Sequence, residues 1–258
     1  MSLLISSVYT YDADASAYIL AVEAADGQTL EPATRSAINK FVVGCKADGI
    51  WTAIKASCIL SGARTLAGAL VPLAGTAPTN FNFVSGDYNR KTGLGDASNT
   101  TKYLNSNRTG VADPQNNHHL AVYVTTANTN ASSVYIGGEA YSRNTIYGDL
   151  TASIAVSLRT NTVDTTGRPT STTGLIAGSR SASNLVNWRV SGISGTFSTG
   201  SSSDTYPSIF VYGRNIGSIN SNYSNARLAF YSIGESLDLA LFDDRVTDLI
   251  NAFSVTIP

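Results

Sequence analysis

The sequence predicts a mainly β protein: a two-sheet antiparallel sandwich with helices at both ends of the chain. Beyond Pro78, short apolar or alternating runs are separated by clusters of Gly, Asn, Ser, Thr and Asp, which is the pattern of strands joined by turns. Runs with helical spacing lie before that point and after Gly234. With 258 residues, 43% of them hydrophobic, the chain can bury the core of one large β-domain or of two small ones.

Two helices are expected near the N-terminus. The first covers Ala15–Ala25, and the second covers Ala33–Ala47 behind Pro32, whose missing N–H is harmless in a first turn. Each has one apolar face, so these helices and the C-terminal helix are expected to pack together. The apolar positions are Tyr18, Ile19 and Val22 in the first helix, and Ala37, Ile38, Phe41, Val42 and Cys45 in the second.

The segment from Ala226 to Phe253 predicts a central strand followed by an amphipathic helix. The strand covers Arg227–Ile233, and both of its faces are largely apolar, as in the middle of a sheet. Ser236 is the expected N-cap of the helix, with Asp238 in its first turn. Alternation places Leu228, Phe230 and Ser232 on one side of the strand, and Ala229, Tyr231 and Ile233 on the other. The apolar stripe of the helix is Leu239, Phe242, Val246, Leu249, Ile250 and Phe253.

The other strands fall between these ends, and they set the expected boundaries. A helical segment covers residues 1–56, the β-sandwich 57–235, and the C-terminal helix and tail 236–258. The N-terminal segment could be a separate docking unit, but the lack of a Pro/Gly/Ser hinge near Ala56 favours one compact domain. The remaining expected strands are Ser57–Leu60, Thr101–Asn105, His119–Thr126, Ser132–Gly137, Leu150–Arg159, Leu175–Ser179, Trp188–Ile193 and Ser208–Tyr212.

Composition argues against several classes of partner. The net charge is −1 and there is no basic run, so wide binding to nucleic acid or to an anionic membrane is not expected. No apolar run approaches the roughly 20 residues needed to cross a bilayer. The N-terminus lacks the basic region and long apolar core of a secretory signal, so synthesis in the cytosol is expected.

No catalytic constellation is expected, so we predict that the protein is not an enzyme. His118 and His119 are the only histidines, and alternation in a strand places them on opposite faces. They are interpreted as a hydrogen-bonded pair at the strand edge. A glycosidase would need two carboxylates facing one cleft. The acids of the strand region lie in loop or turn contexts: Glu139, Asp149, Asp164 and Asp204.

No metal or other cofactor is expected. Zinc would require further His or Cys ligands at short spacing. Calcium stays open through backbone carbonyls near Asp87 and Asp96, which are isolated acids in the sequence. Cys45 and Cys58 are interpreted as buried free thiols, with a bridge between them or a reactive thiol as alternatives.

Binding is the activity that the composition favours. The chain has 13 Tyr, and several lie in loops rich in Asn, Ser and Gly, a mixture that suits a polar flat ligand or a protein interface. The candidate contact residues are Tyr141, Trp188, Tyr206 and Tyr223. The alternative is that the tyrosines stack within ordinary β-loops and that Trp188 belongs to the core or to a subunit contact.

Two segments carry a resemblance to a known family: Lys46-Ala47-Asp48-Gly49-Ile50-Trp51, and the strand from Arg227 to Gly234 with its continuation to Leu237. The chain resembles virion structural proteins of tailed bacteriophages, cyanophages included, that carry a concanavalin-A-like or laminin-G-like jelly-roll. The segments Thr101–Asn107 and His118–Val124 are similar to early strands of that family. The resemblance implies a jelly-roll fold, a place in the virion after synthesis in the host cytoplasm, and no catalytic residues.

Three hypotheses follow for function. In the first, the chain is a head decoration or cement, collar or tail-fibre protein that works by contact with other virion proteins (capsid, portal or tail), as a homo-oligomer. In the second, it is a carbohydrate-binding module that recognises a host surface glycan. In the third, it is a glycan lyase or hydrolase.

Overall fold

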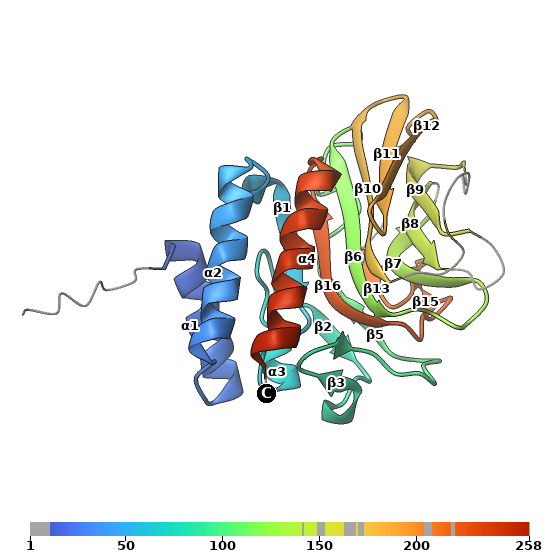
Figure 1. Ribbon diagram of the computed structural model, residues 1–258. Coiled ribbons are helices and arrows are strands. Elements are labelled where there is room, and N and C mark those ends of the chain that lie inside the picture. The colour runs from blue at the N-terminus through green and yellow to red at the C-terminus, as the bar shows by residue number, and fades with distance from the viewer. Residues whose placement is uncertain are drawn as a thin grey trace, which may run out of the picture.

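The protein forms three layers: helices, a first sheet (sheet A) and a second sheet (sheet B), as Figure 1 shows. The helices cover one face of sheet A, and sheet B covers the other. The expected mainly β fold, a two-sheet antiparallel jelly-roll sandwich with terminal helices, is confirmed. The computed structural model describes residues 11–140, 142–148, 153–162, 169, 173–203, 208–217 and 220–257. Among these residues, no helix has the length and apolar character required to cross a membrane.

The expected helices are confirmed to within a few residues. Helix α1 (Ala13–Asp26) and helix α2 (Pro32–Ala47) form the N-terminal part, and α4 (Leu239–Thr256) ends the chain. Helix α2 packs along α4 and against α1, so the apolar faces meet as predicted. Shorter helical turns are α3 (Leu66–Ala69), η1 (Trp51–Ala53) and η2 (Ser85–Asp87).

Helix α4 begins later than predicted. Asp238, and not Ser236, is the N-cap: its carboxylate accepts hydrogen bonds from the backbone N–H groups of Ala240 and Leu241. Ser236 has a different role, because its N–H and hydroxyl both donate to the Asn117 side-chain oxygen, at 2.9 and 2.5 Å. Ser236 and Asp238 are both suitable N-cap residues, and the contact of Ser236 with Asn117 leaves the capping role to Asp238.

Sheet A has eight strands and lies between the two other layers. Strand β1 (Ile54–Ile59) pairs with the central strand β16 (Arg227–Gly234). Because both faces of the sheet are covered, strands β6 and β16 are buried almost throughout. The order across the sheet is β12 (Ile193–Ser198), β11 (Leu185–Val190), β10 (Gly174–Ala182), β6 (His118–Thr126), β16 (Arg227–Gly234), β4 (Gly93–Leu94) and β3 (Tyr88–Asn89).

Sheet B also has eight strands. Strand β8 (Arg143–Gly148) pairs with β7 and with β9 (Ala155–Thr160). The pairing is antiparallel except for one parallel bridge, between Asn215 and Gly138. The order is β15 (Asn220–Ser221), β14 (Arg214–Asn215), β7 (Ser133–Glu139), β13 (Phe210–Val211), β5 (Tyr103–Asn105) and β2 (Thr79–Phe81).

Strand β16 is central, as expected, but its side-chain alternation is not the predicted one. The pairing with β6 shifts register between Leu228 and Phe230. Leu228 therefore joins Tyr231 and Ile233 in the core between the sheets, whereas Ala229 and Phe230 both belong to the core under the helices. An extra residue in one strand of a ladder reverses the facing of the residues beyond it.

Several other strand predictions need correction. The expected strand Trp188–Ile193 runs across the turn at Ser191 and Gly192, whose φ angles are +48° and +82°, so two strands meet there. Strand β8 was not expected, and neither were the short strands β2, β3, β4, β14 and β15. The remaining expected strands begin or end within three residues of the observed ones, except Leu150–Arg159, which begins at Ala155 and whose residues 150–152 lie outside the described residues.

Candidate functional site

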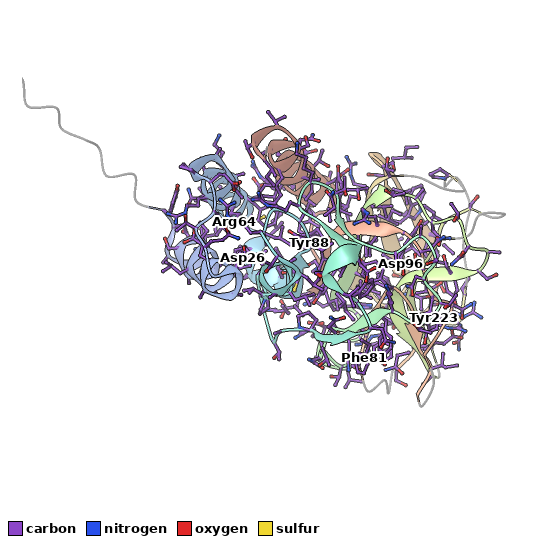
Figure 2. All side chains as sticks on the ribbon, turned by 90° about the horizontal axis from the view of Figure 1, so that it is seen from below. Asp26, Arg64, Phe81, Tyr88, Asp96 and Tyr223 are labelled. Atoms are coloured by element: carbon purple, nitrogen blue, oxygen red, sulfur yellow. The ribbon has the colours of Figure 1, made fainter. Side chains whose placement is uncertain are left out.

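The outer face of sheet B is the large sheet surface that the described helices leave uncovered (Figure 1). Along its strands, alternate residues such as Leu104, Ile146 and Val211 enter the core between the sheets. Their neighbours in sequence point outward. Figure 2 shows Phe81 and Tyr223 on the side of the molecule away from α1 and α2.

Four aromatic side chains form a row on this face, which we call the aromatic row: Phe81, Tyr103, Phe210 and Tyr223. Tyr103 stacks on Phe81 with ring centroids 4.4 Å apart and planes 4° apart. Phe210 packs on Tyr103 at 4.7 Å, and Tyr223 lies 6.3 Å from it. Burial, and next the neighbouring Tyr223, raise the pKa of Tyr103. Because the rings pack against one another across strands β2, β5 and β13, they form a continuous apolar ridge.

A polar cluster lies beside the row, and we call it the Arg214 cluster. The Arg214 guanidinium donates to the Glu139 carboxylate, to the Tyr147 hydroxyl at 2.6 Å and to the Asn222 side-chain oxygen at 2.9 Å. Arg143 Nε donates to the other Glu139 oxygen at 3.1 Å. Burial raises the pKa of Tyr147, which therefore stays a neutral donor and acceptor at physiological pH.

The cluster adjoins the aromatic row through the strand register. Phe210 is opposite Gly137 in β7, and Glu139 follows two residues later on the same face. Gly137 carries no side chain, and a Cβ there would meet Thr145 and the Asn144 carbonyl at 2.5 and 2.8 Å. The face thus places apolar ring surface next to fixed hydrogen-bonding groups.

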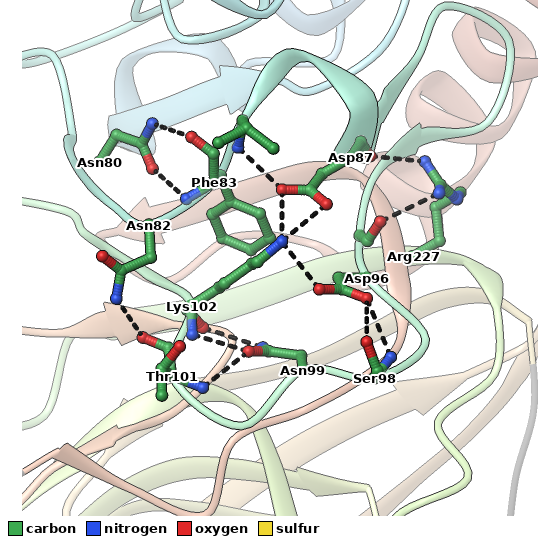
Figure 3. A network of polar contacts seen from close by, with 12 residues as sticks. Asn80, Asn82, Phe83, Asp87, Asp96, Ser98, Asn99, Thr101, Lys102 and Arg227 are labelled. Carbon is green, nitrogen blue, oxygen red and sulfur yellow. Dashed lines mark hydrogen bonds and ion pairs between the residues drawn. The ribbon is translucent and has the colours of Figure 1, made fainter.

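A buried ion-pair network holds the segment that leads into Tyr103 (Figure 3). The Lys102 ammonium lies between two carboxylates, 2.7 Å from Asp87 and 2.8 Å from Asp96. Its hydrogen bond to Asp96 lowers the pKa of that acid to about 2. The expectation of isolated acids is therefore wrong, because the carboxylates of Asp87 and Asp96 both contact the Lys102 ammonium.

Asn99 extends this network to both tyrosines of the row. Its side-chain oxygen accepts from the backbone N–H groups of Thr101 and Lys102, at 3.1 and 2.7 Å. Its amide nitrogen donates to the Ser224 carbonyl at 2.8 Å. Tyr103 and Tyr223 are the chain neighbours of Lys102 and Ser224, so one buried side chain fixes the backbone beside each.

A polar groove lies on the opposite side of the molecule, between α4 and one end of sheet A. It encloses about 840 Å³ and is lined in part by Tyr123 and Lys91. Two of its acids are paired: Asp243 with Arg189, and Asp48 with Arg245, each at 2.6 Å. No group of three or more His, Cys, Asp and Glu residues in the described part of the chain is placed to hold a metal ion.

The four predicted contact residues have different outcomes. Tyr223 belongs to the aromatic row. Trp188 is 6% exposed and packs in the core between the sheets, so its prediction as a contact residue is wrong. The reason is that Gly195 on the neighbouring strand leaves space for the indole, which a Cβ there would strike. Tyr141 and Tyr206 lie outside the described residues.

The histidines and cysteines are structural. His118 bonds to Asn144 at 2.9 Å, while His119 bonds to Ser232 at 2.8 Å and packs edge-on against Phe242. The two rings thus face opposite sides of sheet A, as predicted. Burial lowers the pKa of His118 to about 3 and that of His119 to about 4. Both cysteines are free and buried, and burial raises the pKa of each thiol to about 12, so neither is reactive.

Sequence reasoning missed most of the residues on this face. Tyr103 and Phe210 fell within expected strands, and Phe81 alternates with Phe83, but nothing in the sequence placed the three strands side by side. In the sequence Glu139 stands out only as an acid in a loop, and no motif marks Arg214. The usable signal was an aromatic residue at outward positions of several short strands.

Comparison with known proteins gives structural likeness alone. No family model matches the chain, and no curated protein does. The binding domain of botulinum neurotoxin serotype D is 12% identical, with a TM-score of 0.49 over 76% of this chain and 51% of that chain. Domain 4 of AbnA, a GH43 extracellular arabinanase from Geobacillus stearothermophilus, is 15% identical, with a TM-score of 0.39 over 69% and 82% of the two chains.

A GH54 α-L-arabinofuranosidase is 14% identical, with a TM-score of 0.37 over 78% of this chain and 44% of that chain. This chain therefore spans about half the length of the toxin domain and less than half of the arabinofuranosidase. Likeness at this level carries no conclusion about what this chain binds.

Proposed function

We propose that the chain is a non-enzymatic recognition module that binds a surface glycan with the outer face of sheet B. The observation that carries this proposal is that the aromatic row and the Arg214 cluster lie side by side in the strand register, on a face that no described helix covers. A sugar presents C–H surface, which packs on aromatic rings, and hydroxyl groups, which need donors and acceptors of fixed direction.

The charges on this face suit binding better than bond cleavage. Glu139 accepts from Arg143 and Arg214 through different oxygens, so both of its oxygens are engaged by arginines. Acid catalysis on a glycosidic bond would require a carboxyl group that keeps its proton near neutral pH. A half-buried arginine–carboxylate pair can instead donate to and accept from neighbouring sugar hydroxyls through its exposed atoms.

A glycan array with the labelled chain, followed by calorimetry on the best ligand, tests the proposal. Phe81→Ala removes ring surface from an exposed edge strand, and Arg214→Lys keeps the charge but loses the planar fork. Each is expected to weaken binding about tenfold or more, the loss of roughly 1.4 kcal/mol. The matched controls, Val255→Ala and Arg35→Lys, lie on the helices and should leave binding unchanged. Absence of binding to every glycan at about 100 μM would overturn the proposal.

A place in a phage particle is the second candidate, and it rests on the resemblance to virion structural proteins. The feature that favours it here is the stacking of the row, because ring edges and exposed apolar groups such as Phe81 and Val84 also suit a protein contact. The chain would then act as a decoration, collar or tail-fibre component. It should co-sediment with purified particles, and Phe81→Ala should reduce this; failure of the unaltered chain to join particles would exclude the role.

A further inference from the structure

Strand β12 leaves the longest open edge among the described strands. It ends sheet A, pairs with β11 through six consecutive residues without a register shift, and is exposed or half-buried throughout. The other end strands β3, β15 and β2 have two or three residues each. Strand β1 also has six residues, but it is largely buried and Ser57 in its middle pairs with Ala74. The six-residue strand β9 is buried, and the Ser202 N–H donates to the Arg159 carbonyl beside it.

The turn before β12 shows which backbone groups are open. Ser191 and Gly192 form a two-residue hairpin loop with positive φ at both positions, so the flanking residues Val190 and Ile193 form a hydrogen-bonded pair. Alternation then directs the backbone groups of every second residue away from β11. These residues are Ser194, Thr196 and Ser198, and all three are exposed.

Nothing in the sequence of β12 blocks this edge. The strand Ile193–Ser198 contains no charged residue and no proline, and it has no bulge. Ile193 is 52% exposed. Proteins that stay monomeric protect long edge strands with lysine, proline, bulges or a covering segment. An unprotected edge of this length is expected to have a partner strand.

We propose that β12 pairs with β12 of a second copy of this chain, antiparallel and about a two-fold axis at Thr196. Identical antiparallel strands are self-complementary, so the contact closes as a dimer and does not propagate. Thr196 meets its own copy and Ser194 meets Ser198, which gives three hydrogen-bonded pairs with about six backbone bonds. In this register Phe197 lies opposite Gly195 of the second copy, in a pair without backbone hydrogen bonds.

A charged strand would repel its own copy, whereas this neutral strand brings no like charges together. The dimer would join the two A sheets into one continuous sheet and leave the outer face of each sheet B free. The inference therefore stands independently of the proposed glycan binding and can fail or hold without it.

Sedimentation of the full chain from about 1 to 200 μM tests the dimer. The unaltered chain is expected to pass from monomer to dimer over this range. Thr196→Pro removes an outward N–H that β11 does not use, and Thr196→Lys places two ammonium groups at the axis. Both should raise the dimer dissociation constant at least tenfold, while Thr196→Val, which keeps the N–H and the shape, should leave it within threefold.

Circular dichroism melts of the variants show whether the fold is retained. A chain that stays monomeric at about 200 μM overturns the proposal, and so does a dimer that folded Thr196→Pro and Thr196→Lys variants leave unchanged. Glycan binding by a monomeric Thr196→Lys chain would show that the two surfaces act separately.

Discussion

Lys102 is the residue whose charge organises the loop before Tyr103. Its side chain is 18% exposed, and its ammonium neutralises two carboxylates that would otherwise face each other. Lys102→Met leaves that pair without a cation, so we expect a loss of about 1–3 kcal/mol of stability at pH 7, measured by urea unfolding. Lys91→Met, which removes the same charge from an exposed loop, should change stability by less than about 0.5 kcal/mol.

The pH dependence of this effect follows from the pKa of Asp96, which Lys102 lowers to about 2 from 3.8. A lowered carboxyl pKa contributes stability above the unfolded value, and that contribution disappears as the pH falls through the folded value. The difference between the unaltered chain and Lys102→Met should therefore shrink between about pH 4 and 2. A difference that stays constant over this range would contradict the role given to the ion pair.

His118 and His119 make the fold sensitive to mild acid. Burial keeps both rings neutral, with pKa values of about 3 and about 4, whereas the unfolded chain takes up a proton near pH 6.5. Between these pKa values only the unfolded chain binds the proton, so the free energy of unfolding falls as the pH drops below 6.5. The expected decrease is about 2 kcal/mol per histidine between pH 7 and 5. In urea unfolding at several pH values, His119→Gln should flatten this dependence by about half; an unchanged slope would contradict it.

At the scale of elements, the helices could be predicted because their information is local. The spacing of apolar residues in α2, and the proline that starts it, need no knowledge of the rest of the chain. The central position of strand β16 could be predicted, but the direction of its side chains could not. The register shift between Leu228 and Phe230 arises from pairing with β6. The β11–β12 turn, formed by Ser191 and Gly192, was likewise hidden inside an apolar run.

Helix α4 contributes to the core chiefly through Phe242. That ring is fully buried, with its centroid 5.8 Å from Phe230 on β16 and 5.8 Å from His119 on β6. Phe242→Ala should lower the free energy of unfolding, measured with urea, by about 3–5 kcal/mol. The substitution leaves a cavity between the helix and the sheet, and these elements can move only partly to fill it. Leu241 of the same helix is 38% exposed, so Leu241→Ala should cost less than about 1 kcal/mol; equal costs would mean that α4 does not dock as described.

At the scale of the whole molecule, the candidate site is a product of sheet order. Phe81, Tyr103 and Phe210 come from three strands that are distant in sequence, and only the order β13-β5-β2 makes them neighbours. Sequence alone showed a surplus of tyrosine and few charges, which indicated binding as the class of activity. It could not show where, because the position of a tyrosine in a loop does not depend on strand order. For Trp188 the alternative of a core position holds, since the indole fills the space beside Gly195.

Layering also predicts how the molecule opens. Strands β6 and β16 are covered by helices on one face and by sheet B on the other, so their amides should exchange with solvent only through global unfolding. Amides of β2, whose residues are all exposed, should exchange at least about a hundredfold faster through local opening.

Helix α2 decides whether residues 1–56 behave as a separate unit. Phe41 and Val42 share one core with Phe230 of β16 and Phe242 of α4, so the helix cannot leave without exposing sheet A. We therefore expect the slowest amides of α2, α4 and β6 to converge on one opening free energy as denaturant is added, in native-state hydrogen exchange. If α2 instead opened at a free energy several kcal/mol below that of β6, with its own denaturant slope, the N-terminal segment would be an independently docking unit.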